Sequence, residues 1–197
     1  IVKTFITLCV LAAAFTVTVP LLAQESRINE EIASPMPEIP LKQAMGKEAY
    51  DDAIGSGRYR YIGNSKCRLC HRKFFIGRKK DAHDHATEKL SGSGHEENPR
   101  CLTCHTTGFG TDTGFVSMKS TPRLANVQCE GCHGPGNEHV RLIKAKKSGG
   151  FLAGSDHPVR LEKMCTSCHT QRWNRSYHDL KKAYDSYSSA DPNGKKR

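Results

Sequence analysis

The sequence predicts a single, mainly α-helical domain with much irregular structure and little β-sheet, and three observations support this prediction. Four times, two cysteines three positions apart are followed at once by a histidine, a spacing that places all three side chains on one face of a helical turn. Glycine and proline recur between these segments, as at Gly134-Pro135-Gly136, and favour short helices. Apolar residues make up only 37% of the chain, so the polypeptide alone offers a thin core.

The four Cys-x-x-Cys-His motifs have the spacing at which a c-type haem is attached. In such a motif the two thiols bond the vinyl groups of the porphyrin, and the histidine binds the iron from one side. The cysteines are Cys67, Cys70, Cys101, Cys104, Cys129, Cys132, Cys165 and Cys168, and the histidines are His71, His105, His133 and His169. We therefore predict four covalently attached haem c groups, each with its iron, and a core built around them.

Other uses of paired cysteines do not need a histidine after each pair. Zinc ribbons, redox dithiols and disulfide frameworks all contain such pairs. Eight of the nine cysteines lie in the motifs, and the ninth is Cys9 near the start of the chain. Haem attachment is therefore favoured. Because the haems would supply most of the interior, we expect the haem-free protein not to fold.

Residues 1–23 are predicted to be a signal peptide. Lys3 precedes an apolar stretch from Thr4 to Val19, which is shorter than the roughly 20 residues of a membrane-spanning helix. Ala23 is a small residue at which a signal peptidase could cut, although an uncleaved anchor remains an alternative. Bacteria attach haem c outside the cytoplasmic membrane, so we expect a periplasmic protein without stable membrane insertion after cleavage.

The formal charge of +10 would suit a nucleic-acid-binding protein, but it omits the cofactors. A ferric haem with two propionates carries roughly −1, so four haems bring the protein closer to neutral. Many lysines and arginines are then expected to pair with propionates. We predict no nucleic-acid partner.

The rest of the chain divides by composition into three parts. Residues 24–57 are acidic and proline-containing, and they are predicted to form an extended leader. Residues 58–190 are predicted to form the haem domain, in which the motifs recur at intervals of 34, 28 and 36 residues, too uneven for a solenoid. Residues 191–197 resemble a flexible basic tail.

Within the haem domain we expect a helical turn at every motif and two longer helices. The segment Phe74 to Leu90 is the best candidate for a longer helix, and Asn174 to Tyr187 is the second. Glycine-rich segments at 91–94, 108–110 and 148–150 are predicted to be loops. Trp173 could pack against a porphyrin or in an ordinary core.

Function depends on what binds each iron opposite the motif histidine. Six further histidines are candidates: His83, His85, His95, His139, His157 and His178. None of the four methionines has a setting that marks it as a ligand. Bis-histidine ligation is therefore favoured and predicts low potentials, while the residues alone leave the pairing open.

Three stretches resemble the tetrahaem cytochrome c-554 family, whose founding members accept electrons from hydroxylamine oxidoreductase in nitrifying bacteria. They are Cys67 to Leu90, which has a histidine twelve positions after His71, then Cys101 to Gly110, and Cys129 to Gly136. The stretches have the same order and similar spacing in the family. The resemblance covers Tyr61 to Trp173.

The resemblance implies a crossed ligation of the first and third haems. In the family, the histidine that matches His83 binds the third haem, which is held here by His133. The match to His139 binds the first haem, held here by His71. His85 is an alternative to His83.

The resemblance also implies ligands for the other two haems. The second haem, at His105, would be five-coordinate with an open face, which His95 could close. The fourth haem, at His169, would take its ligand from the carboxyl side, where His178 is the candidate. His157 is its competitor.

We expect a multihaem cytochrome c that relays single electrons between a donor and an acceptor protein and has no catalytic residue. One alternative is a reductase or oxidase of a small nitrogen or sulfur species at an open second haem, where His85, His95 or Glu130 could assist proton transfer. Multihaem nitrite reductases typically have a lysine after the cysteine pair, and no motif here does. The other alternative is a subunit of a larger cytochrome assembly, and the oligomeric state remains open.

Overall fold

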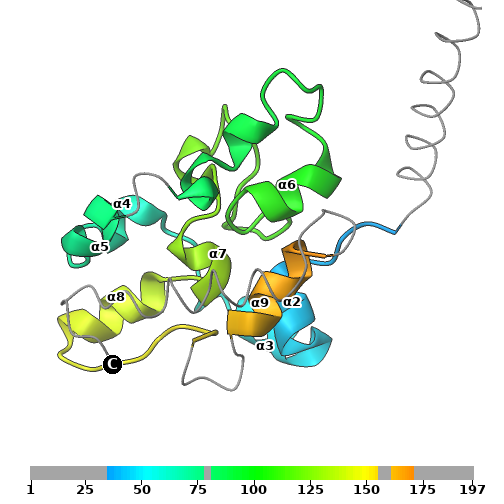
Figure 1. The fold of residues 1–197 in the computed structure, drawn as a ribbon. Coiled ribbons are helices and arrows are strands. Elements are labelled where there is room, and N and C mark those ends of the chain that lie inside the picture. Colours follow the sequence, from blue (N-terminus) through cyan, green and yellow to red (C-terminus); the bar gives the residue numbers. More distant parts are fainter. Residues whose placement is uncertain (1–34, 78–80, 155–160, 171–197) are drawn as a thin grey trace, which may run out of the picture. The chain divides into compact units, whose positions relative to one another are not determined.

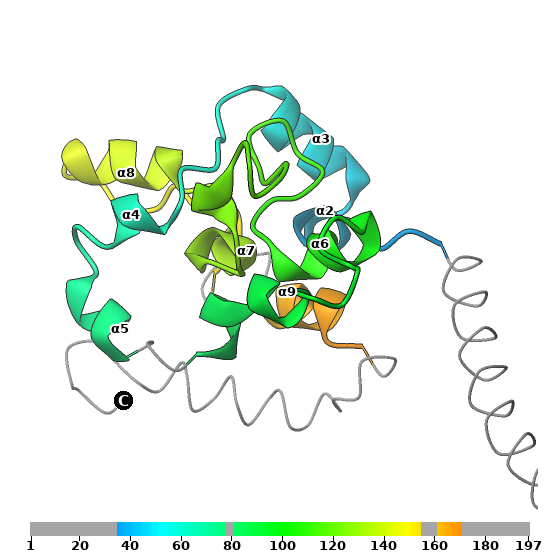
Figure 2. The ribbon, with the colours of Figure 1, turned by 90° about the horizontal axis from the view of Figure 1, so that it is seen from above.

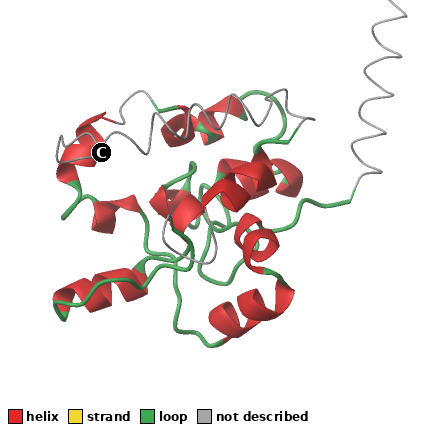
Figure 3. Cartoon of the chain, turned by 60° about the horizontal axis from the view of Figure 1, so that its bottom comes forward, coloured by secondary structure: helices red, strands yellow, loops and turns green. Residues whose placement is uncertain are grey.

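The computed structural model describes residues 35–77, 81–154 and 161–170 (Figure 1). The chain divides into two compact units, residues 1–36 and 37–197, and the second contains every motif. In the described residues all regular structure is helical, and the one β-type contact is an isolated antiparallel bridge between Thr106 and Ala125 (Figure 3). The predicted helical, irregular fold is confirmed to this extent.

Each motif lies on or directly after a short helix. The helices are α4 (Asn64–Cys67), α6 (Pro99–His105), α7 (Cys129–His133) and α9 (Leu161–Cys168). In the first motif the helix ends at Cys67, but the backbone N–H of the motif histidine still donates to the Cys67 carbonyl at 3.0 Å. This i to i+4 hydrogen bond continues the helical turn through the motif. The predicted turn at each motif is confirmed.

The prediction of an extended leader was wrong for its second half. Residues 40–55 form α2 (Pro40–Met45) and α3 (Lys47–Gly55). Proline at the first position of α2 suits a helix start, because its missing N–H has no partner there in any case. Leu41 and Ala44 then lie on one buried face of α2. This face packs against α9, and the two helices lie side by side (Figures 1 and 2).

The predicted helix from Phe74 to Leu90 is also not continuous. The segment contains the end of α5 (Arg72–Gly77) and two 3₁₀ turns, η1 (Ala82–His85) and η2 (Thr87–Lys89). Asp81 starts η1 by accepting a hydrogen bond from the His83 N–H at 3.0 Å. Hydrogen bonds to another segment hold η2, where the Asn126 amide oxygen accepts from the Thr87 N–H at 2.8 Å. Local capping and tertiary bonds therefore override helix propensity here.

The remaining helices of the described residues are η3 (Pro122–Leu124) and α8 (Asn137–Lys144).

Two small apolar clusters form the described core. The first cluster consists of Tyr61, Leu90, Cys101, Leu102, Phe115, Leu124 and Ala125, and the second of Leu41, Ala44, Tyr50, Leu152, Ala153 and Met164. Two separate clusters of this size make only a limited core.

Several predictions lie outside the described residues. These are the signal peptide with Cys9, the helix from Asn174 to Tyr187, Trp173 and the basic tail. Within the described ranges, no helix has both the length and the apolar character that a membrane crossing requires.

Candidate haem-binding sites

The first and third motifs lie next to each other. The Gln128 side chain accepts a hydrogen bond from the Asn64 N–H at 2.7 Å, and the Asn64 side chain accepts one from the Cys129 N–H at 3.3 Å. These bonds hold α4 against α7 and bring Cys67 to Cys129. The two thiols share a hydrogen bond which, with burial, raises the pKa of Cys67. Two haem attachment points are therefore adjacent.

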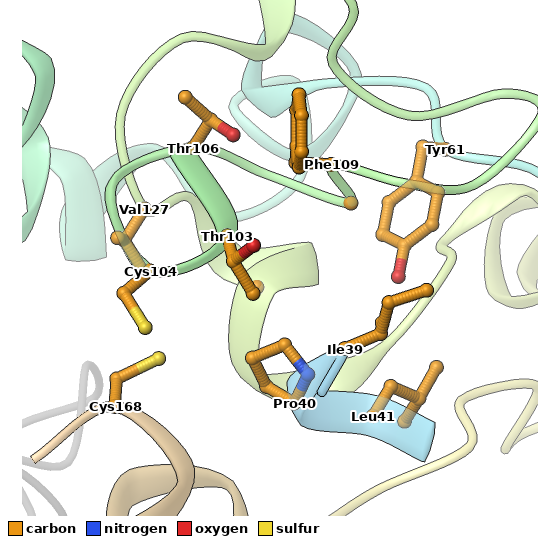
Figure 4. A pocket seen from close by; sticks show the side chains of 12 residues that line it. Ile39, Pro40, Leu41, Tyr61, Thr103, Cys104, Thr106, Phe109, Val127 and Cys168 are labelled. Atoms are coloured by element: carbon orange, nitrogen blue, oxygen red, sulfur yellow. The ribbon is translucent and has the colours of Figure 1, made fainter. Parts of the chain in front are cut away.

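The second and fourth motifs form a similar pair. The sulfur atoms of Cys104 and Cys168 face each other across one end of a pocket (Figure 4). Their hydrogen bond lowers the pKa of Cys104, and this bond together with burial raises the pKa of Cys168. Most of the other lining side chains are apolar, including Ile39, Pro40, Leu41, Phe109 and Val127, and Thr103 and Thr106 also line the pocket. Gly131 of the third motif also lines it, so three motifs converge here.

The donor groups fit covalently bound haem. The four cysteine pairs supply the thiols from which thioether bonds to haem form. The His105 Nδ1 lies 2.6 Å from the Ala86 carbonyl oxygen, and the His133 Nδ1 lies 3.2 Å from the Ala153 carbonyl oxygen. A ring that donates from Nδ1 keeps its Nε2 lone pair for a metal. Burial lowers the pKa of His133 and so favours the neutral, ligating form.

His139 lies opposite the histidine of the first motif. The ring centroids of His71 and His139 are 6.3 Å apart. Two imidazoles that bind one iron from opposite sides have centroids about 6 Å apart, because each metal–nitrogen bond is about 2 Å long. The His139 Nδ1 is held 2.8 Å from the Gly149 carbonyl oxygen, and Phe151 packs on its ring at 4.3 Å. This is the pair that the resemblance implies for the first haem.

The other candidate ligands have different surroundings. The His83 ring lies 5.8 Å from that of His169, whereas the resemblance implies His133 as its partner. The His85 Nδ1 lies 2.9 Å from a carboxylate oxygen of Glu88. His95 is exposed in the loop before α6. His157 and His178 lie outside the described residues.

Glu130 has a structural role that sequence reasoning missed. Its side chain is only 1% exposed and accepts hydrogen bonds from the backbone N–H groups of Ile62 at 3.0 Å, Gly63 at 2.7 Å and Gly136 at 2.7 Å. It therefore ties the segment before the first motif to the third motif and to the Gly-Pro-Gly turn. Burial raises the pKa of Glu130. An acidic residue between motif cysteines is ordinarily expected at the surface, so only its position next to glycine-rich backbone hinted at this role.

Adjacent Cys-x-x-Cys-His turns with oriented imidazoles define a class, the multihaem c-type cytochromes of electron transfer. Residues 66–134 match the family described as Cytochrome c554 and c-prime, and over these residues the chain is similar to the cytochrome c-554 family.

Two known proteins are similar to this chain. Cytochrome c-554 of Nitrosomonas europaea is 28% identical over 134 residues, a match that covers 55% of this chain and 57% of that protein. The multiheme cytochrome MtrA of Shewanella baltica is 31% identical over 94 residues, which cover 40% of this chain and 26% of that protein. The chain thus matches less than two thirds of the length of either relative. No solved structure gives a significant match.

Proposed function

We propose that this chain holds four haem c groups and relays single electrons between redox proteins in the periplasm. The observation that carries the proposal is the convergence of the motifs: Cys67 lies beside Cys129, Cys104 lies beside Cys168, and α7 contacts α9. When bound, each haem supplies an iron that accepts and returns one electron. The chain contributes the thiols that fix each group and the imidazoles that orient toward it.

The surface around the first motif favours an acidic partner. From residue 53 to residue 80 the sequence has nine lysines and arginines and no aspartate or glutamate. Lys66, Arg68, Arg72 and Lys73 are all exposed, and Leu69, inside the motif, is 79% exposed. An exposed apolar residue ringed by charges of one sign is typical of a transient redox contact that oppositely charged partners approach quickly. We name these four basic residues and Leu69 the basic face.

The haem count and the electron count test this proposal directly. Intact mass spectrometry of the exported protein should show four haems, and a reductive titration should consume four electrons per chain. Fewer than four of either would contradict the proposal.

The chain should also be recovered from the periplasmic fraction with its amino terminus near Gln24. Recovery from the cytoplasm with residues 1–23 still attached would contradict the assigned compartment.

We also propose that the protein is a carrier and not an enzyme. No described residue is assigned an acid–base role, and the motif histidines His105 and His133 are held through Nδ1, which leaves Nε2 for an iron. Reduced protein should therefore react with nitrite, hydroxylamine or nitric oxide no faster than the haem is oxidised by air. Turnover well above that rate would favour a reductase or oxidase instead.

A size-exclusion mass far above that of one chain would favour a subunit of a larger assembly.

A further inference from the structure

We propose that the start of α2 forms an apolar wall of the haem site between the second and fourth motifs and raises the reduction potential of a haem bound there. The inference rests on the proposed haem binding and deepens it. The wall consists of Ile39, Pro40 and Leu41, which line the same pocket as Cys104 and Cys168 (Figure 4). We name these three residues the α2 wall.

The thiols in this pocket bring a haem next to the α2 wall. A thioether bond joins the edge of a porphyrin directly to a cysteine sulfur, so a haem on Cys104 or Cys168 lies against the side chains around that sulfur. The α2 wall belongs to these surroundings but lies outside residues 66–134, the stretch that matches the cytochrome c-554 family. This chain therefore adds the wall from a segment that precedes the matched stretch.

Ile39 is held against the segment that follows the second motif. A Cβ at Gly110 would lie 3.3 Å from the Ile39 Cδ1, and the φ of +84° at Gly110 also favours glycine. Phe109, the residue before this glycine, lines the pocket together with Ile39. The Gln43 N–H donates to the Ile39 carbonyl at 2.9 Å and so fixes Ile39 at the first turn of α2. The close approach of Ile39 therefore depends on a glycine at position 110.

Leu41 is held against the third and fourth motifs. A Cβ at Gly134, the residue directly after the third motif, would lie 3.3 Å from the Leu41 Cδ2. Leu41 is only 2% exposed and belongs to the second apolar cluster, which also contains Met164 of α9. Since α9 carries the cysteines of the fourth motif, the α2 wall touches segments that belong to three of the four motifs.

The composition of the pocket gives the wall its effect on potential. The described residues that line the pocket include no lysine, arginine, aspartate or glutamate. Oxidation leaves a positive charge on the iron porphyrin, which water stabilises and apolar side chains do not, so an apolar wall favours the reduced state. A carboxylate placed in the wall should therefore lower the potential of the neighbouring haem, and an ammonium group there should raise it.

A redox titration of exported holoprotein, resolved into one-electron components, tests the proposal. Ile39 is half-buried, so the position suits charged substitutions. Ile39→Asp should lower the midpoint potential of one component, Ile39→Lys should raise that of the same component, and Ile39→Val should keep the wild-type value. Each variant should keep the haem mass of the wild-type protein. A role in folding alone would not give shifts of opposite sign, and unchanged potentials or shifts of the same sign in the two charged variants would overturn the proposal.

Met45 provides the matched control, because it lies on the same helix and packs against the second apolar cluster but does not line the pocket. Met45→Asp and Met45→Lys should shift this component far less, and shifts as large as those at Ile39 would overturn the proposal. If the charged Ile39 variants lose haem, Leu41→Ala provides the second test. It should lower the same component by admitting water, and an unchanged potential would overturn the proposal.

The haem mass of the wild-type protein separates a failure of this inference from a failure of the proposed function. Four haems together with unchanged potentials in the variants would overturn only the role of the α2 wall. Fewer than four haems in the wild-type protein would contradict the proposed function itself.

Discussion

The imidazole rings of His71 and His139 lie with their centroids 6.3 Å apart and their planes inclined by 30°. His71 follows the cysteines of the first motif, whereas His139 comes from α8, after the third motif. The two segments meet because α4 contacts α7 and because the loop after α8 returns to hold the His139 ring through Gly149. A histidine on the helix after the third motif therefore lies next to the histidine of the first motif.

His139→Ala should leave the first haem with one axial ligand. We expect a new high-spin iron by electron paramagnetic resonance and loss of one low-spin signal, with the other signals unchanged. Exogenous imidazole should reverse the change. A variant that stays fully low-spin would show that His139 is not the ligand.

Gly150 should control the position of His139. A Cβ at Gly150 would lie 2.5 Å from the His139 backbone nitrogen, at a φ of +89° that side chains disfavour. Gly149 has a similar φ of +91° with no atom within 4 Å of such a Cβ. Gly149→Ala should therefore cost about 1 kcal/mol of unfolding free energy from conformation alone. Gly150→Ala should cost about 3 kcal/mol, because the clash adds to the strain.

Chemical denaturation of the holoproteins compares the stabilities of the two glycine variants. The electron paramagnetic resonance signal of the first haem, at His71, reports whether His139 has moved. Only Gly150→Ala should also disturb the low-spin signal of the first haem. Equal losses of stability in both variants would mean that the contact with His139 has no energetic weight.

Removal of the Glu130 carboxylate should destabilise the link between the first and third motifs. Glu130→Ala leaves the N–H groups of Ile62, Gly63 and Gly136 without their acceptor. At roughly 1 kcal/mol or more for each buried unpaired group, the loss should be about 3 to 5 kcal/mol. Thermal unfolding of holoprotein measures it, with the exposed Glu97→Gln as control. A loss no larger than that of the control would refute the role given to Glu130.

Glu138 should contribute to stability at neutral pH and lose that contribution in acid. Its buried carboxylate accepts hydrogen bonds from Arg141 and, at 2.6 Å, from Arg58, and these bonds lower its pKa. A carboxyl whose folded-state pKa lies below its unfolded value stabilises the fold above the unfolded value. The contribution is lost as the pH falls from about 4.5 through the lowered pKa.

Glu138→Gln removes this titration. The difference in melting temperature between wild-type protein and the variant should therefore shrink as the pH falls through this range, since the charged pair is then lost in both. Taking the difference cancels the titration of other carboxyl groups. A difference that stays constant with pH would show that the ion pairs of Glu138 do not stabilise the fold.

Charge reversal on the basic face should slow reduction by an acidic donor. Lys66→Glu/Lys73→Glu should lower the second-order rate of reduction by a flavodoxin, an acidic one-electron donor, by about tenfold at low ionic strength. The difference should diminish as salt is added, because screening shortens the range of the field. Lys119→Glu, also exposed but remote in sequence, is the control. Equal rates in the control and the double variant would remove the basic face as the docking site.

The sequence by itself determined the chemistry of the motifs and the helical turn on which each one lies. The spacing of Cys101, Cys104 and His105 within five residues is a local property, and a single helical turn satisfies it. The small apolar fraction likewise predicted that the described core would be limited to small clusters. These inferences needed only neighbours along the chain.

Only the tertiary structure decided which motifs and histidines meet. The 3₁₀ turn η2 is held by Asn126, which lies far along the sequence, and α2 is stabilised by its contact with α9. The contact between the rings of His83 and His169 and the burial of Glu130 depend equally on the path of the backbone between distant segments. Hydrogen bonds and packing across such separations leave no periodic signal in the sequence, so the residues alone could not show which histidines lie side by side.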